Sequence, residues 1–127
     1  MIKLQPKLFG KIAISLLFIF ALIASTTIPG QKADAASSSL AGFKYSKKVP
    51  LPKAQQQYLY KMTKQRGLDY KETLAVMLHE SNMKVKAKGG SNYGYFQINK
   101  INHKNLAKIT KTKNKPYDPY VNMNWGT

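Results

Sequence analysis

The chain has 127 residues, of which 21 are Lys or Arg and 5 are Asp or Glu, so its net charge at pH 7 is +16. It contains no cysteine, which excludes disulfides, cysteine-based zinc sites and a thiol nucleophile. This length predicts one small domain with a modest core. Because acids are so scarce, each carboxylate in an apolar segment becomes a candidate for function.

Residues 1–35 predict a secretion signal peptide. Three lysines precede an apolar run of 13 residues over 12–24, and Ala33-Asp34-Ala35 has the small-x-small pattern of a cleavage site. The run is shorter than the roughly 20 residues that span a bilayer, so we expect no stable membrane span after cleavage. An uncleaved N-terminal anchor is the alternative. The expected product is secreted and associated with the cell wall, with residues 36–50 as an N-terminal tail.

The charge of the remaining chain predicts an anionic partner. Residues 36–127 retain 17 basic and four acidic residues, a net charge of about +13, and every basic residue except Arg66 is a lysine. Specific readers of nucleic acid usually rely on arginine, so we expect no specific nucleic acid as a partner. Because an exported protein meets an anionic cell wall first, we expect attraction to the polymers of that wall. The alternative is that the charge serves solubility alone. We expect a monomer.

Helical periodicity predicts a mainly α-helical domain. A first helix is expected over 53–66 and should stop at Gly67. A second should run from Asp69 to Glu80, since Asp69 and Glu72 have the spacing of a capping box. Its apolar composition predicts a core helix. The apolar stripe of the first helix consists of Ala54, Tyr58, Leu59 and Met62.

The second half of the domain has weaker signals. Residues 81–93 predict a loop because of Gly89-Gly90, and a weaker helix is expected over 102–111. Asp118 followed by Pro119 is typical of a helix start. No strand pair is expected.

Glu80 is the strongest candidate for chemistry. It follows Val76, Met77 and Leu78, and an apolar setting can keep a carboxyl protonated so that it donates a proton to a leaving oxygen. The alternative is a solvated glutamate at a helix end. The histidines, His79 and His103, do not have metal-ligand spacing, so we expect structural or surface roles for both and neither a metal nor a cofactor.

Glu80-Ser81-Asn82 and the later run Ser91-Asn92-Tyr93-Gly94-Tyr95-Phe96-Gln97-Ile98-Asn99 together resemble the catalytic core of soluble lytic transglycosylases, in the lysozyme-like superfamily. In that family a Glu-Ser pair precedes a Gly-Leu-Met-Gln-type motif. The likeness continues through Asn122-Met123-Asn124-Trp125-Gly126 and covers roughly residues 51–127. It implies a mainly α, lysozyme-like fold. Because domains of this family run further, the resemblance also implies that the fold is incomplete at the C-terminus.

The resemblance assigns roles to individual residues. Glu80 is the catalytic acid, and Ser81 orients its carboxylate or touches the substrate. Gly94 lets the sugar approach the backbone, which a residue without a Cβ allows. Gln97 hydrogen-bonds the N-acetyl groups of the glycan. The remaining substrate-binding positions implied are Tyr95, Phe96 and Asn99. For the aromatic residues Tyr93, Tyr95 and Phe96, the alternative is packing in the core.

Asn92 distinguishes between two reactions. Most glycosidases need two catalytic carboxylates. In animal-type lysozymes an aspartate at the similar position is the second of these. With Asp69, Glu72 and Asp118 assigned to helix starts, Glu80 is left as a single acid. The resemblance then implies cleavage of the MurNAc–GlcNAc β-1,4 bond with formation of 1,6-anhydro-MurNAc. The alternatives are a hydrolytic muramidase that recruits Asp118, and an inactive remnant that binds the wall or nucleic acid by charge.

Overall fold

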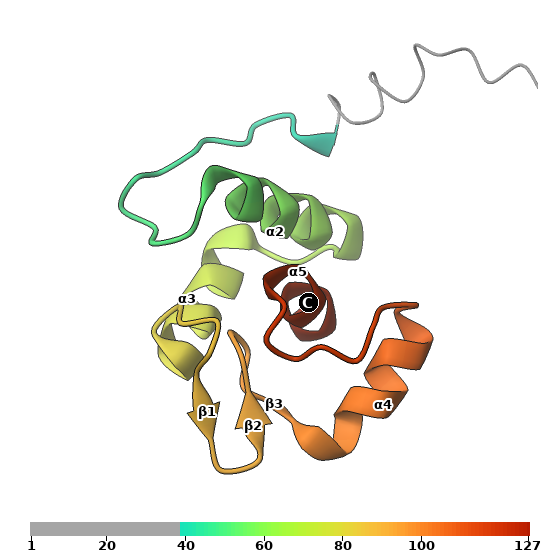
Figure 1. Ribbon diagram of the computed structural model, residues 1–127. Helices are drawn as coiled ribbons and strands as arrows, with labels where there is room; N and C mark the ends of the chain where they lie inside the picture. Colours follow the sequence, from blue (N-terminus) through green and yellow to red (C-terminus); the bar gives the residue numbers. More distant parts are fainter. Residues whose placement is uncertain (1–38) are drawn as a thin grey trace, which may run out of the picture. The chain divides into compact units, whose positions relative to one another are not determined.

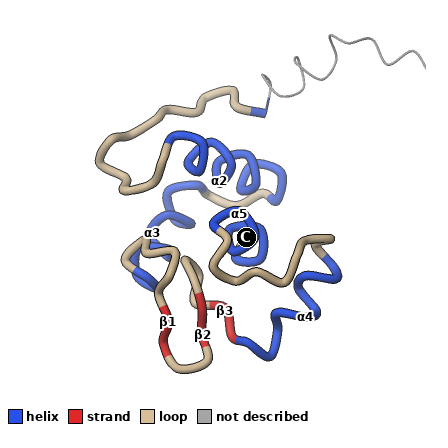
Figure 2. The backbone as a smooth tube through the Cα atoms, viewed as in Figure 1, coloured by secondary structure: helices blue, strands red, loops and turns tan. Residues whose placement is uncertain are grey.

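The computed structural model describes residues 39–127 (Figure 1). The chain divides into two units, residues 1–35 and 36–127, and the predicted signal peptide lies outside the described residues. Helices α2 to α5 and a small three-stranded sheet make up the second unit (Figure 2). None of the helices in 39–127 combines the length and the apolar character that crossing a bilayer requires.

Helix α2 spans Lys53–Arg66 and ends at Gly67, as predicted. Gly67 has φ 68° and forms a left-handed cap, which glycine adopts at low cost. The predicted apolar stripe is correct in part: Leu59 is buried and Tyr58 packs against the core, whereas Ala54 is exposed. The buried face also includes two polar residues that the stripe left out, Gln56 and Thr63.

Gln56 is fully buried and binds the segment that precedes α2. Its Nε2 donates to the carbonyl oxygens of Ser46 and Leu51, each at 2.9 Å, and its Oε1 accepts from the N–H of Ser46 at 3.2 Å. These bonds satisfy the buried amide and hold the segment against the helix. Leu51 is thereby placed in the core, with 3% of its surface exposed.

Helix α3 spans Tyr70–Ser81. Asp69 caps it by accepting from the N–H of Glu72 at 2.9 Å, as predicted. The second bond of the predicted capping box, from the Glu72 side chain back to the N–H of Asp69, is not formed within residues 39–127. The prediction of an enclosed core helix was wrong: only Thr73, Met77 and Ser81 are buried, whereas Val76 and Leu78 are about half exposed. The composition of a helix does not say how many of its faces the other elements cover.

The loop predicted after α3 contains a small antiparallel sheet. Its strands are β1 (Lys88–Gly89), β2 (Asn92–Tyr93) and β3 (Ile98–Asn99), in that order. In the register Gly89 is opposite Asn92, which is opposite Asn99. The expectation of no strand pair was wrong because a strand of two residues shows no alternation in the sequence.

Helix α4 spans Lys100–Ile109 and begins two residues before the predicted start. The side chain of Asn99 accepts from the N–H of Ile101 at 3.1 Å, so it caps the helix directly after β3. Helix α5 spans Pro119–Gly126, and Asp118 caps it as predicted.

Helix α5 occupies the centre of the described unit. Figure 1 shows it end-on, with α2 above it, the strands below and α4 to its right, and it contacts α2 and β3. Arg66, at the end of α2, donates to the carbonyl oxygen of Asn124 and to Oγ1 of Thr127, each at 2.6 Å. The core around it is formed by Leu51, Leu59, Met77, Tyr95, Phe96 and Met123.

Tyr70 provides a test of this packing. Its hydroxyl is buried without a hydrogen-bond partner in the structure described, and burial raises its pKa. Tyr70→Phe is expected to stabilise the domain by about 1 kcal/mol, because the change removes an unsatisfied polar group. Tyr60→Phe is the matched control, since the Tyr60 hydroxyl donates to the carbonyl of Ala41 at 2.8 Å and its loss should destabilise by about 1 kcal/mol. Urea unfolding measures both, and equal shifts in the same direction would contradict the expectation.

Candidate active site

The Gly94–Gln97 segment, named here the motif loop, lies in the core of the domain. Gly94 has φ 77°, a conformation that glycine adopts readily. A Cβ at this position would collide with the side chain of Asn122 and lie 2.6 Å from the carbonyl oxygen of Pro116. Glycine is therefore required by the fold itself, while the approach of a sugar to this backbone stays a prediction.

Asn122, on α5, shapes the motif loop. It is fully buried, and its Oδ1 accepts from the N–H of Phe96 at 2.9 Å. Its Nδ2 donates to the carbonyl oxygens of Pro116 at 2.8 Å and Tyr93 at 3.0 Å. Sequence reasoning assigned no role to Asn122, although it lies in the Asn-x-Asn-x-Gly run that carried part of the resemblance.

The two aromatic residues of the motif loop face the core. Tyr95 is 4% exposed and Phe96 8%. The hydroxyl of Tyr95 donates to Oε1 of Gln55 at 2.8 Å, and burial raises the Tyr95 pKa, so the phenol remains a neutral donor. A Cβ on Gly126 would collide with the Phe96 ring. Both side chains therefore anchor the loop in the core, and their contact with a glycan stays a prediction.

Gln97 is held in a strained conformation at the end of the motif loop. Its φ is 48°, which is uncommon for a residue with a Cβ. Its Nε2 donates to the carbonyl oxygens of Gly94 at 2.9 Å and Ala87 at 3.1 Å. Both amide hydrogens are thus used within the fold, which leaves Oε1 as the atom able to meet a ligand.

Glu80 lies in the last turn of α3 with its side chain exposed. Two non-glycine residues with left-handed backbones follow it closely, Asn82 at φ 51° and Met83 at φ 56°. No other residue within 39–127 forms a hydrogen bond or an ion pair with its carboxylate. The prediction that Glu80 lies in an apolar environment was wrong within residues 39–127, because Val76 and Leu78 are about half exposed.

Ser81 and Asn99 have internal partners. Ser81 is 7% exposed, and its Oγ donates to the carbonyl oxygen of Met77 at 3.1 Å. Asn99 caps α4 with its Oδ1, and its Nδ2 donates to Oδ1 of Asn92 at 3.0 Å. Their contact with substrate stays a prediction.

Main-chain hydrogen bonds connect the residues after Glu80 to the motif loop. The N–H of Lys84 donates to the carbonyl oxygen of Ser81 at 3.1 Å, and the N–H of Gly94 donates to that of Ala87 at 2.9 Å. Since Gln97 binds the same Ala87 oxygen, the two sequence motifs belong to one hydrogen-bonded framework.

The part of the domain that the structure describes is also hollowed away from Glu80. A hollow of about 620 Å³ lies between residues 42–49 and helices α2 and α3, and one of about 390 Å³ lies beside α4. Neither is lined by Glu80. Within residues 39–127 no three His, Asp or Glu side chains gather in a way that could hold a metal ion.

Comparison with known families gives a match to the transglycosylase SLT domain over residues 57–127. Comparisons with curated proteins and with solved structures gave no significant match. The matched region runs from within α2 to α5 and includes Glu80, the motif loop and Asn122. Its mainly helical fold with a small sheet agrees with the lysozyme-like architecture that the sequence predicted. The chain therefore belongs to the transglycosylase SLT domain family, whose function is the degradation of peptidoglycan.

Proposed function

We propose that the chain is an exported lytic transglycosylase that cleaves the MurNAc–GlcNAc β-1,4 bond with Glu80 as its acid and base. The family match over residues 57–127 carries this proposal. The positions of the other carboxylates support the choice of Glu80, since Glu72 lies at the opposite end of α3 and the two aspartates within residues 39–127 cap helices. Asp69 accepts from the N–H of Glu72, and Oδ1 of Asp118 accepts from the N–H groups of Tyr120 and Val121 at 2.9 and 3.0 Å.

The reaction needs only one carboxyl group if the substrate assists. Glu80 donates its proton to the glycosidic oxygen, the bond from that oxygen to the muramoyl C1 breaks, and the acetamido group stabilises the cationic carbon. The Glu80 carboxylate then takes the proton of the 6-hydroxyl, while O6 forms the new bond to C1. The proton lost in the first step is regained in the second, and no water is consumed.

The proposed substrate contacts are made by Ser81, Gly94, Tyr95, Phe96, Gln97 and Asn99. Gln97 offers the sharpest assignment, because its free Oε1 can accept from the N–H of an N-acetyl group but its amide hydrogens are already bound. The protein acts outside the cytoplasm, as a monomer, and its charge attracts it to anionic wall polymers.

Product analysis tests the proposal. Purified peptidoglycan is digested with the protein, and the released muropeptides are identified by mass spectrometry. Products with 1,6-anhydro ends, lighter by one water than hydrolysed products, are expected. Reducing muramic acid ends would instead establish the hydrolytic muramidase, although the use of the Asp118 carboxylate as a cap does not favour it.

The exposure of Glu80 favours a second candidate, a cationic wall-binding protein without catalysis. The Glu80 carboxylate has no hydrogen-bond or ion-pair partner within residues 39–127 and lines neither described hollow. Zymography on cell-wall gels separates the candidates. Clearing by the wild type establishes an enzyme, whereas wall binding without clearing establishes the binding protein.

A further inference from the structure

Residues 84–117 form a strongly basic part of the domain. This segment contains nine lysines and no aspartate, glutamate or arginine, and all nine lysines are exposed. It comprises the small sheet, α4 and the turn that leads to α5. No carboxylate within the segment offsets its charge.

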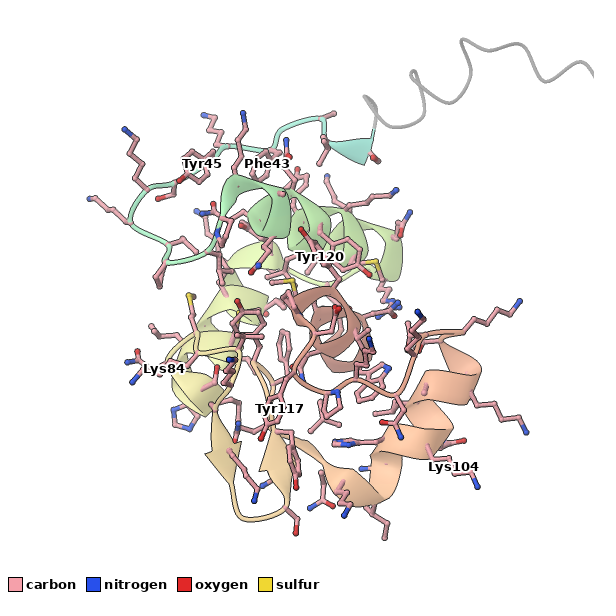
Figure 3. All side chains as sticks on the ribbon, in the orientation of Figure 1. Phe43, Tyr45, Lys84, Lys104, Tyr117 and Tyr120 are labelled. Atoms are coloured by element: carbon pink, nitrogen blue, oxygen red, sulfur yellow. The ribbon has the colours of Figure 1, made fainter. Side chains whose placement is uncertain are left out.

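The hollow of about 390 Å³ lies within this basic segment. It is lined by Tyr93 from β2, by Lys100, His103 and Lys104 from α4, and by Asn114 and Pro116 from the turn. Figure 3 labels Lys104 on α4 and Tyr117 between the strands and α5. Lys88 extends from β1 so that its Nζ lies 5.6 Å from the centroid of the Tyr93 ring.

Three lysines thus lie in or beside one concave surface, named here the lysine hollow. Lys100 and Lys104 line it, and Lys88 lies over the Tyr93 ring that also lines it. Lys100 and Lys104 are one helical turn apart, a spacing at which like charges repel and destabilise a helix by a few tenths of a kcal/mol. An anion bound between them would remove this repulsion. Asn114 adds a neutral amide donor to the same wall.

The packing of the aromatic rings indicates what kind of polyanion fits. Tyr93 is in contact with the rings of His103 at 5.3 Å and Tyr117 at 5.4 Å, and Lys88 lies over it. Single-stranded nucleic acids are held by bases stacked on free aromatic faces, whereas the Tyr93 ring already has Lys88, His103 and Tyr117 as neighbours. The absence of arginine from residues 84–117 also removes the usual bidentate readers of bases. Lysines bind phosphate as point charges.

We propose that the lysine hollow binds a phosphodiester polymer that carries no bases, such as the poly(alditol phosphate) chains of a cell wall. The proposed function includes an attraction to anionic wall polymers, and this inference identifies the binding site and the polymer responsible. It rests on that attraction alone. It does not require cleavage by Glu80. The Glu80→Gln variant is expected to bind the polymer as the wild type does, whatever its cleavage activity. Its binding therefore tests the lysine hollow separately from the proposed cleavage.

The test measures binding of the full chain to poly(glycerol phosphate) by titration at several salt concentrations. A triple variant, Lys88→Gln with Lys100→Gln and Lys104→Gln, is expected to bind at least about 10-fold more weakly. The slope of log affinity against log salt should fall by about 2 to 3, as expected when three counterions are no longer released.

A second triple variant is the matched control. Lys47→Gln, Lys48→Gln and Lys61→Gln remove the same charge from exposed positions outside the hollow and should weaken binding by less than about 3-fold. Equal losses in the two triple variants would overturn the proposal, because they would show an effect of net charge alone.

Two further arms test the hollow and the chemistry of the partner. Asn114→Trp fills the hollow without changing the charge and should weaken binding at least about 3-fold relative to Asn105→Trp, an exposed position on α4 that does not line it. An oligothymidylate of the same charge should bind more weakly than poly(glycerol phosphate). Equal or tighter binding of the oligonucleotide, or of peptidoglycan freed of phosphate polymers, would overturn the assignment.

Discussion

Glu80→Gln is expected to lower the rate of glycan cleavage by about 10²–10⁴-fold, the range that a positioned general acid or base contributes. Glutamine keeps the size of the side chain but can neither donate the proton to the leaving oxygen nor accept the one from the 6-hydroxyl. No second carboxylate is expected to substitute for it, because Asp69 and Asp118 cap helices and Glu72 lies at the opposite end of α3. The rate is measured as soluble muropeptide released from purified peptidoglycan.

Glu72→Gln is the matched control for this prediction. Glu72 is an exposed glutamate on the same helix, so the substitution makes the same change in charge two turns away. Both variants should unfold at the wild-type urea concentration, since neither side chain has a hydrogen bond or ion pair within residues 39–127. If Glu80→Gln cleaved as fast as Glu72→Gln, Glu80 would not be the catalytic acid.

Gly94→Ala is expected to destabilise the domain by about 2–4 kcal/mol. A left-handed backbone at a residue with a Cβ costs about 1 kcal/mol or more, and the overlap with Asn122 and Pro116 adds about 1–3 kcal/mol. Asn122 cannot move aside without giving up its bonds to Tyr93, Phe96 and Pro116. For a small domain this is a large share of the total stability.

Gly90→Ala isolates the steric part of this effect. Gly90 also has a positive φ, 59°, but a Cβ there would meet nothing within 4 Å. It should therefore cost only about 1 kcal/mol. Urea unfolding of both variants gives the difference, and a loss at Gly94 no greater than that at Gly90 would show that the motif loop relaxes around the added methyl group.

Helix boundaries were predictable where one side chain or one glycine sets them. Asp69, Asp118 and Gly67 act within a few residues of themselves, so their roles can be seen in the sequence. Asn99 acts in the same way but was overlooked as a cap because it was assigned to the motif that precedes it. The start of α4 was therefore placed two residues late.

Burial was harder to predict because it depends on distant elements. Gln56 was not expected in the core, yet its amide is satisfied by backbone groups of residues 46–51. Val76 and Leu78 were expected there and are about half exposed. The same limit applies to the site: the sequence singled out Gly94 and Gln97 but not Asn122, whose bonds to Phe96 and Tyr93 span 26 and 29 residues of chain.

The position of Asn122 has a consequence for the order of folding. The bonds that shape the motif loop come from a helix much later in the chain, and Arg66 reaches across 58 residues to the same helix. Contacts of such long separation close slowly, because the entropy of the intervening loop must be lost first. The segments around Glu80 can form local helix early, but the motif loop acquires its shape only when α5 docks.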